Sequence, residues 1–417
     1  MQNKAIKLFW KLFLCTFPFS VSFVLYEQNS YRFGNFSPWV TGFLFLPELL
    51  LALTFVLWFI QNTQNKKRSQ LPAPSWRLTL FLLFLVNAGV VTFLQGDLIL
   101  YSFFLIRVLE AGAVYTLIRQ KLIPHNELIA WLLYGAIFQI VLGFAQTKLN
   151  HSIGLHFIGE PVIGPEVVNV AKTDISSTAK LIRPYGTFLH PNILGAYLMT
   201  VLFLSLPYLK KAALPFWIIL LSIGIYLTGS QAAELTVLVV ACILVILSLT
   251  KVAVQKRTLS LGMLGLLLLG NLAVYIKSSS LSWNFASIQE RLVQNVISQS
   301  MFLHNWWGVG VGNFTLVMEK FSKVILLPWD FQPVHNVYFL ILNETGIQGL
   351  ILFILIIGTL LHSYWKADKS YFLKDKARIL PLFALIIAAS FDHLLWTSWI
   401  GMILVGIVVA ETTRPIS

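Results

Sequence analysis

The sequence predicts an all-α integral membrane protein with about 12 transmembrane helices and two long loops on the outer face. Of its 417 residues, 57% are hydrophobic and only 11% are charged, whereas a soluble domain is typically about 25% charged. The apolar residues form runs of about 20, the length that crosses a hydrocarbon core ~30 Å thick. The basic residues gather in alternate connections between these runs. We therefore interpret residues 1–417 as a single integral membrane domain.

Each predicted span is an apolar run bounded by charged or turn-forming residues. The first run lacks a convincing small-residue cleavage site and is followed at once by another, so a helix is predicted there rather than a signal peptide. The last two runs are closely coupled. The predicted spans are 8–26, 38–61, 78–95, 98–118, 128–147, 192–209, 214–230, 232–250, 259–276, 336–361, 379–397 and 399–411.

The positive-inside rule orients these spans. Most of the 30 Lys and Arg residues lie in connections on one side, which is therefore the cytoplasm and holds both termini. These connections carry Lys4, Lys7, Lys11, Lys66, Lys67, Arg68, Arg77, Arg119, Lys121, Lys210, Lys211, Lys251, Lys256, Arg257, Lys366, Lys369, Lys374, Lys376, Arg378 and Arg414. The net charge of +13 thus reflects topology and does not imply nucleic acid. The long outer loops are 148–191 and 278–335.

Several classes of chemistry find no support in the sequence. Cys15 and Cys242 lie apart in separate apolar runs, without a CxxC or zinc-binding spacing. The cytoplasmic connections are short, and neither a Walker nor a GxGxxG loop occurs. We therefore predict no cofactor and an activity on the outer face that does not use ATP.

Charged residues at membrane depth call for a partner or a role. Arg107 and Glu110 are three residues apart on one helical face, so they can form an ion pair. Glu234 and Glu344 also fall within predicted spans. Each could either hold helices together or belong to a functional site.

Two motifs frame the entry into the span at 192–209 and the turn at 228–230. In LIRPYGTFLHPNILGAYL, Arg183 and His190 lie just ahead of the span, and Asn192 can cap it. A rigid loop entry with surface side chains is the alternative interpretation. In LTGSQAAEL, a turn that opens a helix at Ser230 can offer backbone N–H groups to an anion. An ordinary helix cap is the alternative there.

The second long loop contains a predicted amphipathic helix from Ile288 onward, with Arg291 near its start, and then the turn GVGVGNF. The stretch HNVYFLILNETGIQG follows and places His335 at the outer mouth of the span 336–361. Gly346 lies three turns deeper, and Gly346 and Gly349 would let another helix approach closely. His335 could be an interfacial residue, but Arg183, His190, Arg291 and His335 all project to the outer face. Asp392 and His393 lie toward the outer end of the span 379–397.

The order of these motifs resembles the O-antigen ligase and polymerase family, whose members handle lipid-linked glycans on the outer face of the bacterial membrane. The resemblance covers residues 180–350 and rests on RPYGTFLHPNILGAYL (183–198), LTGSQAAEL (227–235), Arg291 followed by GVGVGNF (308–314), and HNVYFLILNETGIQG (335–349). It implies that His335 and Arg291 are essential. A second essential Arg commonly follows the Ser of the turn, where this chain has Gln231. Either another cation such as Arg183 supplies that charge, or this member is altered or inactive.

The resemblance implies a metal-independent transfer of a glycan from an undecaprenyl-diphosphate carrier to an acceptor hydroxyl. His335 and Arg291 would be catalytic. The candidates for binding the diphosphate or glycan are Arg183, His190, Asn192, Ser230, Gln231, Asp392 and His393. The implied partners are the lipid-linked donor, a glycan, lipid or cell-wall acceptor, and the bilayer of the bacterial cytoplasmic (inner) membrane.

Several functions fit this resemblance. Ligase, polymerase and protein glycosyltransferase share the chemistry. A transporter or flippase of lipid-linked glycan is an alternative of a different class, although the polar candidates gather on one face rather than along a path through the middle. A catalytically decayed relative is a third alternative, because of Gln231.

Overall fold

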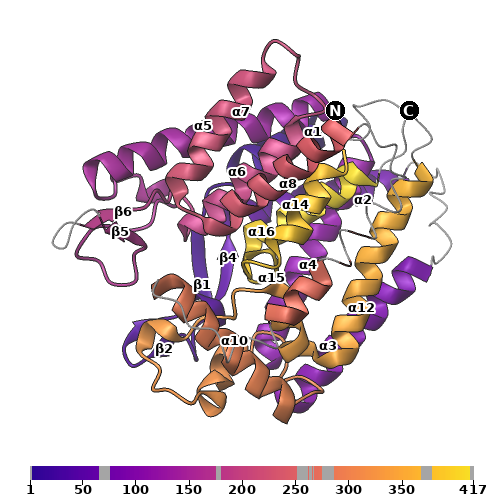
Figure 1. Ribbon diagram of the computed structural model, residues 1–417. Helices are drawn as coiled ribbons and strands as arrows, with labels where there is room; N and C mark the ends of the chain where they lie inside the picture. Colours follow the sequence, from indigo (N-terminus) through magenta and orange to yellow (C-terminus); the bar gives the residue numbers. More distant parts are fainter. Residues whose placement is uncertain are drawn as a thin grey trace.

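The computed structural model describes residues 2–64, 76–174, 180–250, 262, 265, 267–274, 286–367 and 378–413. These residues form helices together with three short two-stranded sheets in the connections. Figure 1 shows the helices fanning across the molecule, with β1 and β4 near its centre. The predicted span at 259–276 lies only partly within the described residues, and of these 267–274 are helical.

The N-terminal part differs from the sequence prediction, because strands replace parts of two predicted spans. Helix α1 (Gln2–Thr16) ends just before Pro18, a residue that lacks an N–H donor and disfavours helix in the residue before it. Strand β1 (Ser22–Tyr26) then pairs antiparallel with β4 (Gly42–Phe45). Between them lie β2 (Tyr31–Arg32), β3 (Asn35–Phe36) and the 3₁₀ turn η1 (Pro38–Val40). Hydropathy reports that these residues are apolar but does not report their backbone conformation.

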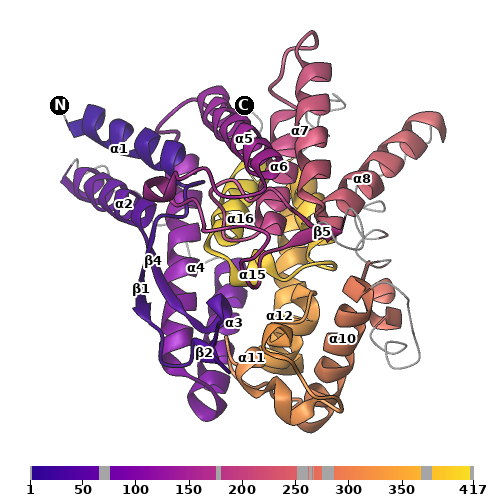
Figure 2. The same cartoon turned by 90° about the vertical axis from the view of Figure 1, so that its left-hand side faces the viewer.

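Five described helices are long and apolar enough to cross a membrane, and the count of twelve is therefore not confirmed. They are α2 (Leu46–Gln64), α3 (Trp76–Gln95), α4 (Leu98–Arg119), α5 (His125–Leu149) and the first 26 residues of α12, Val337–His362. Asp97 caps α4 by accepting hydrogen bonds from the N–H groups of Ile99 and Leu100 at 2.8 and 3.4 Å. Figure 2 shows α1 and α2 side by side.

A further group of apolar helices packs together, with α6 as its most buried member. They are α6 (Pro191–Ser205), α7 (Leu214–Thr228), α8 (Gln231–Thr250), α14 (Leu380–Ala388) and α16 (Trp399–Thr412). Helix α6 is buried along nearly its whole length and packs against α5, α7, α8, α14 and α16. A helix that is apolar on all sides is expected at such a position.

The remaining elements lie in or beside the two long loops. The first loop holds η2 (His156–Ile158), β5 (Lys172–Asp174) and β6 (Lys180–Ile182). The second holds α10 (Ala286–His304), α11 (Phe314–Val317), η4 (Met318–Phe321) and η5 (Pro328–Asp330). The predicted amphipathic helix from Ile288 is therefore present as part of α10, with Leu292 and Ile297 buried. The full helix α12 spans Val337–Ala367, and α15 spans Leu394–Thr397.

Helix α12 is broken at Gly346, where the backbone has φ 76° and ψ 177°. The sequence predicted that Gly346 admits another helix, but the neighbour is the loop after α10, because a Cβ atom at Gly346 would lie 2.3 Å from the carbonyl oxygen of Trp307. Gly349 does face a helix, since its added Cβ would lie 3.0 Å from Asn87 of α3. Helices α3 and α12 pack along each other (Figure 1).

Connections predicted to share the cytoplasmic side meet at Glu411, near the end of α16. Its carboxylate contacts His125 Nδ1 and accepts a hydrogen bond from Tyr208, both at 2.6 Å. Its carbonyl accepts a hydrogen bond from Arg378 at 3.1 Å. These contacts bring His125, Tyr208 and Arg378 together at the end of α16.

Candidate functional site

Most of the predicted site residues are brought together, although they lie on segments far apart in the sequence. Arg183 and His190 come from the approach to α6, Asn192 lies in its first turn, and Arg291 comes from α10. His335 precedes α12, whereas Asp392 and His393 lie in the break between α14 and α15. The contacts that connect them are hydrogen bonds and ring contacts at the ends of these helices.

The break between α14 and α15 leaves backbone carbonyl groups without helical partners. Three of them accept hydrogen bonds from the segments that carry the candidate site. These bonds run from Val337 N to Ala389 O at 2.8 Å, from Asn336 Nδ2 to Ser390 O at 3.0 Å, and from Arg291 Nη1 to Phe391 O at 2.8 Å. The break thus fixes the positions of Arg291 and of the residues directly after His335.

Arg183 is held at the centre of a polar chain. Its Nη2 donates to Asn192 Oδ1 at 2.8 Å, and Asn192 Nδ2 donates to Asp392 Oδ2 at 2.9 Å. Its Nε donates to the carbonyl of Thr228 at 2.7 Å. Burial lowers the pKa of Arg183, against the opposing effects of Tyr185 and Asp392. Its hydrogen bonds hold the guanidinium in a fixed position between the first long loop and the turn before α8.

His190, rather than Asn192, caps helix α6. Its Nδ1 accepts a hydrogen bond from the backbone N–H of Asn192 at 3.1 Å, which corrects the predicted capping role of Asn192. Burial and then the charge of Arg183 lower the pKa of His190 to about 3, despite the opposing effect of Asp392. His190 is therefore neutral at pH 7 and serves as a hydrogen-bond acceptor at this helix end.

His335 lies between Gln294 of α10 and His393. Its Nδ1 is 2.6 Å from Gln294 Oε1, and its ring centroid is 5.1 Å from that of His393. His393 Nδ1 is 2.8 Å from the hydroxyl of Thr397, and its ring packs edge-on against Trp39 at 4.7 Å. Burial holds the pKa of His335 well below its usual range, and the nearby Asp392 carboxylate opposes this shift only in part. A neutral imidazole in this position can accept a proton.

The turn before α8 is more enclosed than the sequence predicted. Gly229 adopts φ +60°, and the backbone N–H of Ser230 donates to the hydroxyl of Thr228 at 3.1 Å. Ser230 is buried, and a Cβ atom at Gly195 would lie 2.6 Å from its Cβ. The Ser230 N–H is therefore occupied by a hydrogen bond within the protein, at a turn where the sequence left open an anion site or an ordinary helix cap. Gln231, by contrast, is exposed.

A cavity of about 750 Å³ adjoins this cluster and was not predicted from the sequence. It reaches the cluster at His190, at Thr397 (the partner of His393) and at Trp39. Its walls are strongly aromatic. They include Phe36, Trp39, Phe43, Phe45, Phe103, Phe104, Trp329, Phe331, Trp396 and Trp399. Lys172 and Lys180 of the first long loop also line it.

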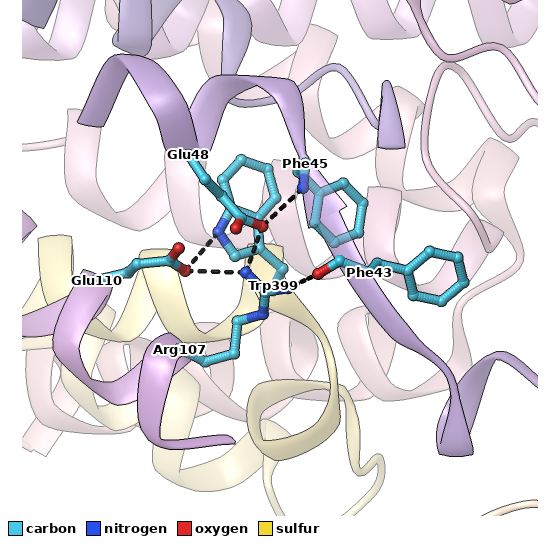
Figure 3. A network of polar contacts seen from close by, with 6 residues as sticks. All are labelled: Phe43, Phe45, Glu48, Arg107, Glu110 and Trp399. Carbon is cyan, nitrogen blue, oxygen red and sulfur yellow. Dashed lines mark hydrogen bonds and ion pairs between the residues drawn. The ribbon is translucent and has the colours of Figure 1, made fainter. Parts of the chain in front are cut away.

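Arg107 lines the same cavity and forms the ion pair with Glu110 that the sequence predicted, at 3.1 Å. It also pairs with Glu48 and donates to the carbonyl of Phe43 (Figure 3). Trp399 Nε1 donates to Glu110 at 3.0 Å. The network therefore joins α2, α4 and α16 with two carboxylates around one guanidinium. Sequence reasoning missed Glu48 because it lies on another helix.

Glu344 has a holding role in the described structure. Its carboxylate accepts hydrogen bonds from the backbone N–H of Gly312 at 3.0 Å and from the indole N–H of Trp396 at 2.9 Å. Of the two roles left open by the sequence, these contacts favour the joining of elements. Gly312 belongs to GVGVGNF, so this hydrogen bond joins the motif to α12 where both border the cavity.

A family model described as O-antigen ligase matches residues 216–354. No curated protein matches the chain. The matched residues run from α7 to the middle of α12 and include Arg291, Gln294 and His335. The matched family is the one that the sequence motifs resemble, and the match covers about a third of the chain.

Proposed function

We propose that this protein transfers a glycan from an undecaprenyl-diphosphate carrier to an acceptor hydroxyl on the outer face of the bacterial inner membrane. The observation that carries the proposal is the convergence of Arg183, Arg291 and His335 beside one large aromatic cavity. The match to the O-antigen ligase family supports ligase or polymerase activity in general. The apolar helices support a membrane location.

Arg291 binds the diphosphate in this proposal. The leaving group gains negative charge as the bond from sugar C1 to the phosphate oxygen breaks. A guanidinium is permanently charged and can meet two phosphate oxygens at once. Its hydrogen bond to the carbonyl of Phe391 fixes the side chain before substrate arrives, which is the arrangement that stabilises developing charge best.

Arg183 supplies a second positive charge. Two hydrogen bonds, to Thr228 O and Asn192 Oδ1, hold it rigidly. It lies directly against the turn that precedes Gln231, the position where the related family commonly has an Arg. We therefore assign to Arg183 the charge that Gln231 lacks. With two guanidinium groups neutralising the diphosphate, the proposed step needs no metal ion.

His335 accepts the proton of the acceptor hydroxyl as the acceptor oxygen bonds to C1. The electron pair of the broken C1–O bond leaves with the diphosphate, and the configuration at C1 inverts. A pKa well below the usual range keeps the imidazole unprotonated at neutral pH, as a proton acceptor must be.

The aromatic cavity holds part of the glycan in this proposal. Sugar rings present apolar C–H faces and polar hydroxyl edges, so flat aromatic walls with polar groups between them suit them. Lys172 and Lys180 would face acidic sugars, where the glycan carries any. Analysis of the product would identify the glycan and would distinguish ligation from polymerisation.

The test is a pair of variants, His335→Ala and Arg291→Ala, expressed in a strain that lacks this gene. Membrane abundance is matched first, and surface glycan is then compared on gels. We expect loss of the glycan or its arrest on the lipid carrier or at one repeat unit. His304→Ala is the matched control, because His304 is an exposed histidine on α10, away from the cluster. Normal glycan in both test variants would refute the catalytic assignment and favour transport or a decayed enzyme.

A further inference from the structure

Gln294 is a buried amide side chain whose contact with His335 the proposed function does not use. Its Oε1 lies 2.6 Å from His335 Nδ1, and the residue is 2% exposed. Its Nε2 is buried without a hydrogen-bond partner in the described part of the chain. A buried amide with an unpartnered donor destabilises a fold, so packing alone does not favour glutamine here. The favourable interaction that this glutamine makes is the contact between its amide oxygen and the imidazole of His335.

The position of Gln294 on α10 fits this contact. It follows Arg291 by three residues, so both side chains lie on one face of the helix. Helix α10 therefore carries both Arg291, the proposed diphosphate-binding residue, and Gln294, the partner of His335. On its other side the His335 ring meets His393, which limits rotation of the imidazole.

The chemistry of the contact sets the position of one proton. An amide oxygen only accepts hydrogen bonds, so the His335 Nδ1 that faces it must carry the hydrogen. A neutral imidazole has one N–H, and its other nitrogen, Nε2, then carries a lone pair. No described residue forms a hydrogen bond with that Nε2.

We propose that Gln294 is a positioning residue that fixes His335 in its Nδ1–H tautomer and so presents Nε2 as the proton acceptor. This inference rests on the proposed function, because it assigns an atom to the base role of His335. The proton of the acceptor hydroxyl moves to Nε2, the acceptor oxygen bonds to C1, and the C1–O electron pair leaves with the diphosphate. The resulting imidazolium has a proton on each nitrogen and releases the Nε2 proton before the next cycle.

An uncharged partner suits this role. The Gln294 oxygen accepts the Nδ1–H bond both before and after Nε2 gains its proton, so nothing needs to rotate during the step. A carboxylate in this place would raise the pKa of His335, so that Nε2 would be protonated at neutral pH. The other charged and titratable groups around His335 are Arg291 on α10, Asp392 and His393 in the break after α14, and His190 at the start of α6.

The kinetic test compares Gln294→Met, which removes the acceptor at similar volume, with Gln294→Glu, which keeps it and adds charge. The probe is the lipid-linked glycan that accumulates in membranes of a strain lacking this gene, transferred to the acceptor in those membranes. Gln289→Met is the control, because Gln289 is an exposed glutamine on the same helix.

We expect Gln294→Met to lower kcat about 10–100-fold with little change in KM, as loss of an orienting partner typically does. Gln294→Glu should lose transfer at neutral pH and recover it at higher pH, because the acid limb of its pH–rate profile moves upward. Transfer by Gln294→Met at the control rate would overturn the inference. Equal loss in both variants at every pH would also overturn it, because a purely structural role predicts that result.

A second measurement does not depend on activity. Nitrogen NMR of ¹⁵N-histidine-labelled protein, with His335→Asn for assignment, distinguishes protonated from unprotonated ring nitrogens. Unprotonated Nε2 in the wild type and a tautomer mixture in Gln294→Met would support the inference, and protonated Nε2 in the wild type would overturn it. If His335→Ala transfers glycan normally, the proposed base fails while the NMR result still decides the tautomer.

Discussion

Replacing Gly346 with Ala should destabilise the protein by about 1.5–6 kcal/mol, the sum of a backbone term and a contact term. The φ of 76° and ψ of 177° lie in a region that essentially only glycine occupies, so a Cβ atom there costs about 1–3 kcal/mol. The added atom would also lie 2.3 Å from the carbonyl oxygen of Trp307. That oxygen belongs to the backbone and cannot rotate away as a side chain can.

The contact term follows from moving the loop that carries Trp307. This loop is joined to α12 by three backbone hydrogen bonds. They run from Ile347 N to Trp306 O at 3.1 Å, from Val309 N to Asn343 O at 2.8 Å, and from Gly310 N to Glu344 O at 2.9 Å. Each contributes about 0.5–1.5 kcal/mol, so losing one or two of them supplies the rest of the expected change.

The assay is the fraction of detergent-solubilised, GFP-fused protein that remains monodisperse after heating to a series of temperatures. Gly358→Ala is the matched control, since Gly358 lies in the same helix and a Cβ atom there meets nothing within 4 Å. The control should match or slightly exceed the wild type, because Ala favours helix over Gly. A Gly346→Ala midpoint equal to that of the control would refute the reasoning.

Three further predictions concern buried charge and pH. Arg107→Met should destabilise the protein by about 3–5 kcal/mol, because it leaves the Glu48 and Glu110 carboxylates without their cation. The double variant Arg107→Met/Glu48→Met should recover part of this loss in the same heating assay. Glu160→Gln should destabilise the first long loop by about 1–3 kcal/mol, because the Glu160 carboxylate accepts hydrogen bonds from the N–H groups of Ile153, Gly154 and Leu155. Limited proteolysis should cleave this variant faster than the control Glu166→Gln, which alters an exposed residue of the same loop. The pKa of His190 is about 3 in the folded protein and about 6.5 in the unfolded chain. Between these values the unfolded chain binds one more proton than the folded protein, so the free energy of unfolding should fall as the pH drops from 6.5 toward 3. His190→Asn should flatten the acid side of the stability–pH curve, and an unchanged slope would contradict this.

The helices that the sequence predicted best are those whose apolar runs are long and uninterrupted. The predicted spans 78–95 and 98–118 correspond closely to α3 (Trp76–Gln95) and α4 (Leu98–Arg119). The predictions at 8–26 and 38–61 covered strands as well as helices, because an apolar strand and an apolar helix have the same hydropathy. Pro18 was the available signal for the end of α1.

Local polar contacts could be predicted, whereas contacts between helices could not. Arg107 and Glu110 are three residues apart, and their pairing follows from helical geometry. Glu48 joins the same guanidinium from 59 residues away, which no spacing rule indicates. Gln294 was missed for a related reason. On an amphipathic helix a glutamine suggests the solvated face, and its position three residues after Arg291 was the only local signal.

The broken helices explain why the candidate site lies where it does. A carbonyl group released at apolar depth must find a donor within the protein. At the end of α14 those donors come from Arg291, Asn336 and Val337, so forming the fold and assembling the site require the same contacts. In the proposed mechanism Arg291 therefore has two functions, holding the carbonyl of Phe391 and presenting positive charge to the diphosphate. Arg291→Lys keeps a donor and a charge but loses the planar fork, so a folded Arg291→Lys protein with impaired transfer would assign the loss to diphosphate recognition rather than to assembly.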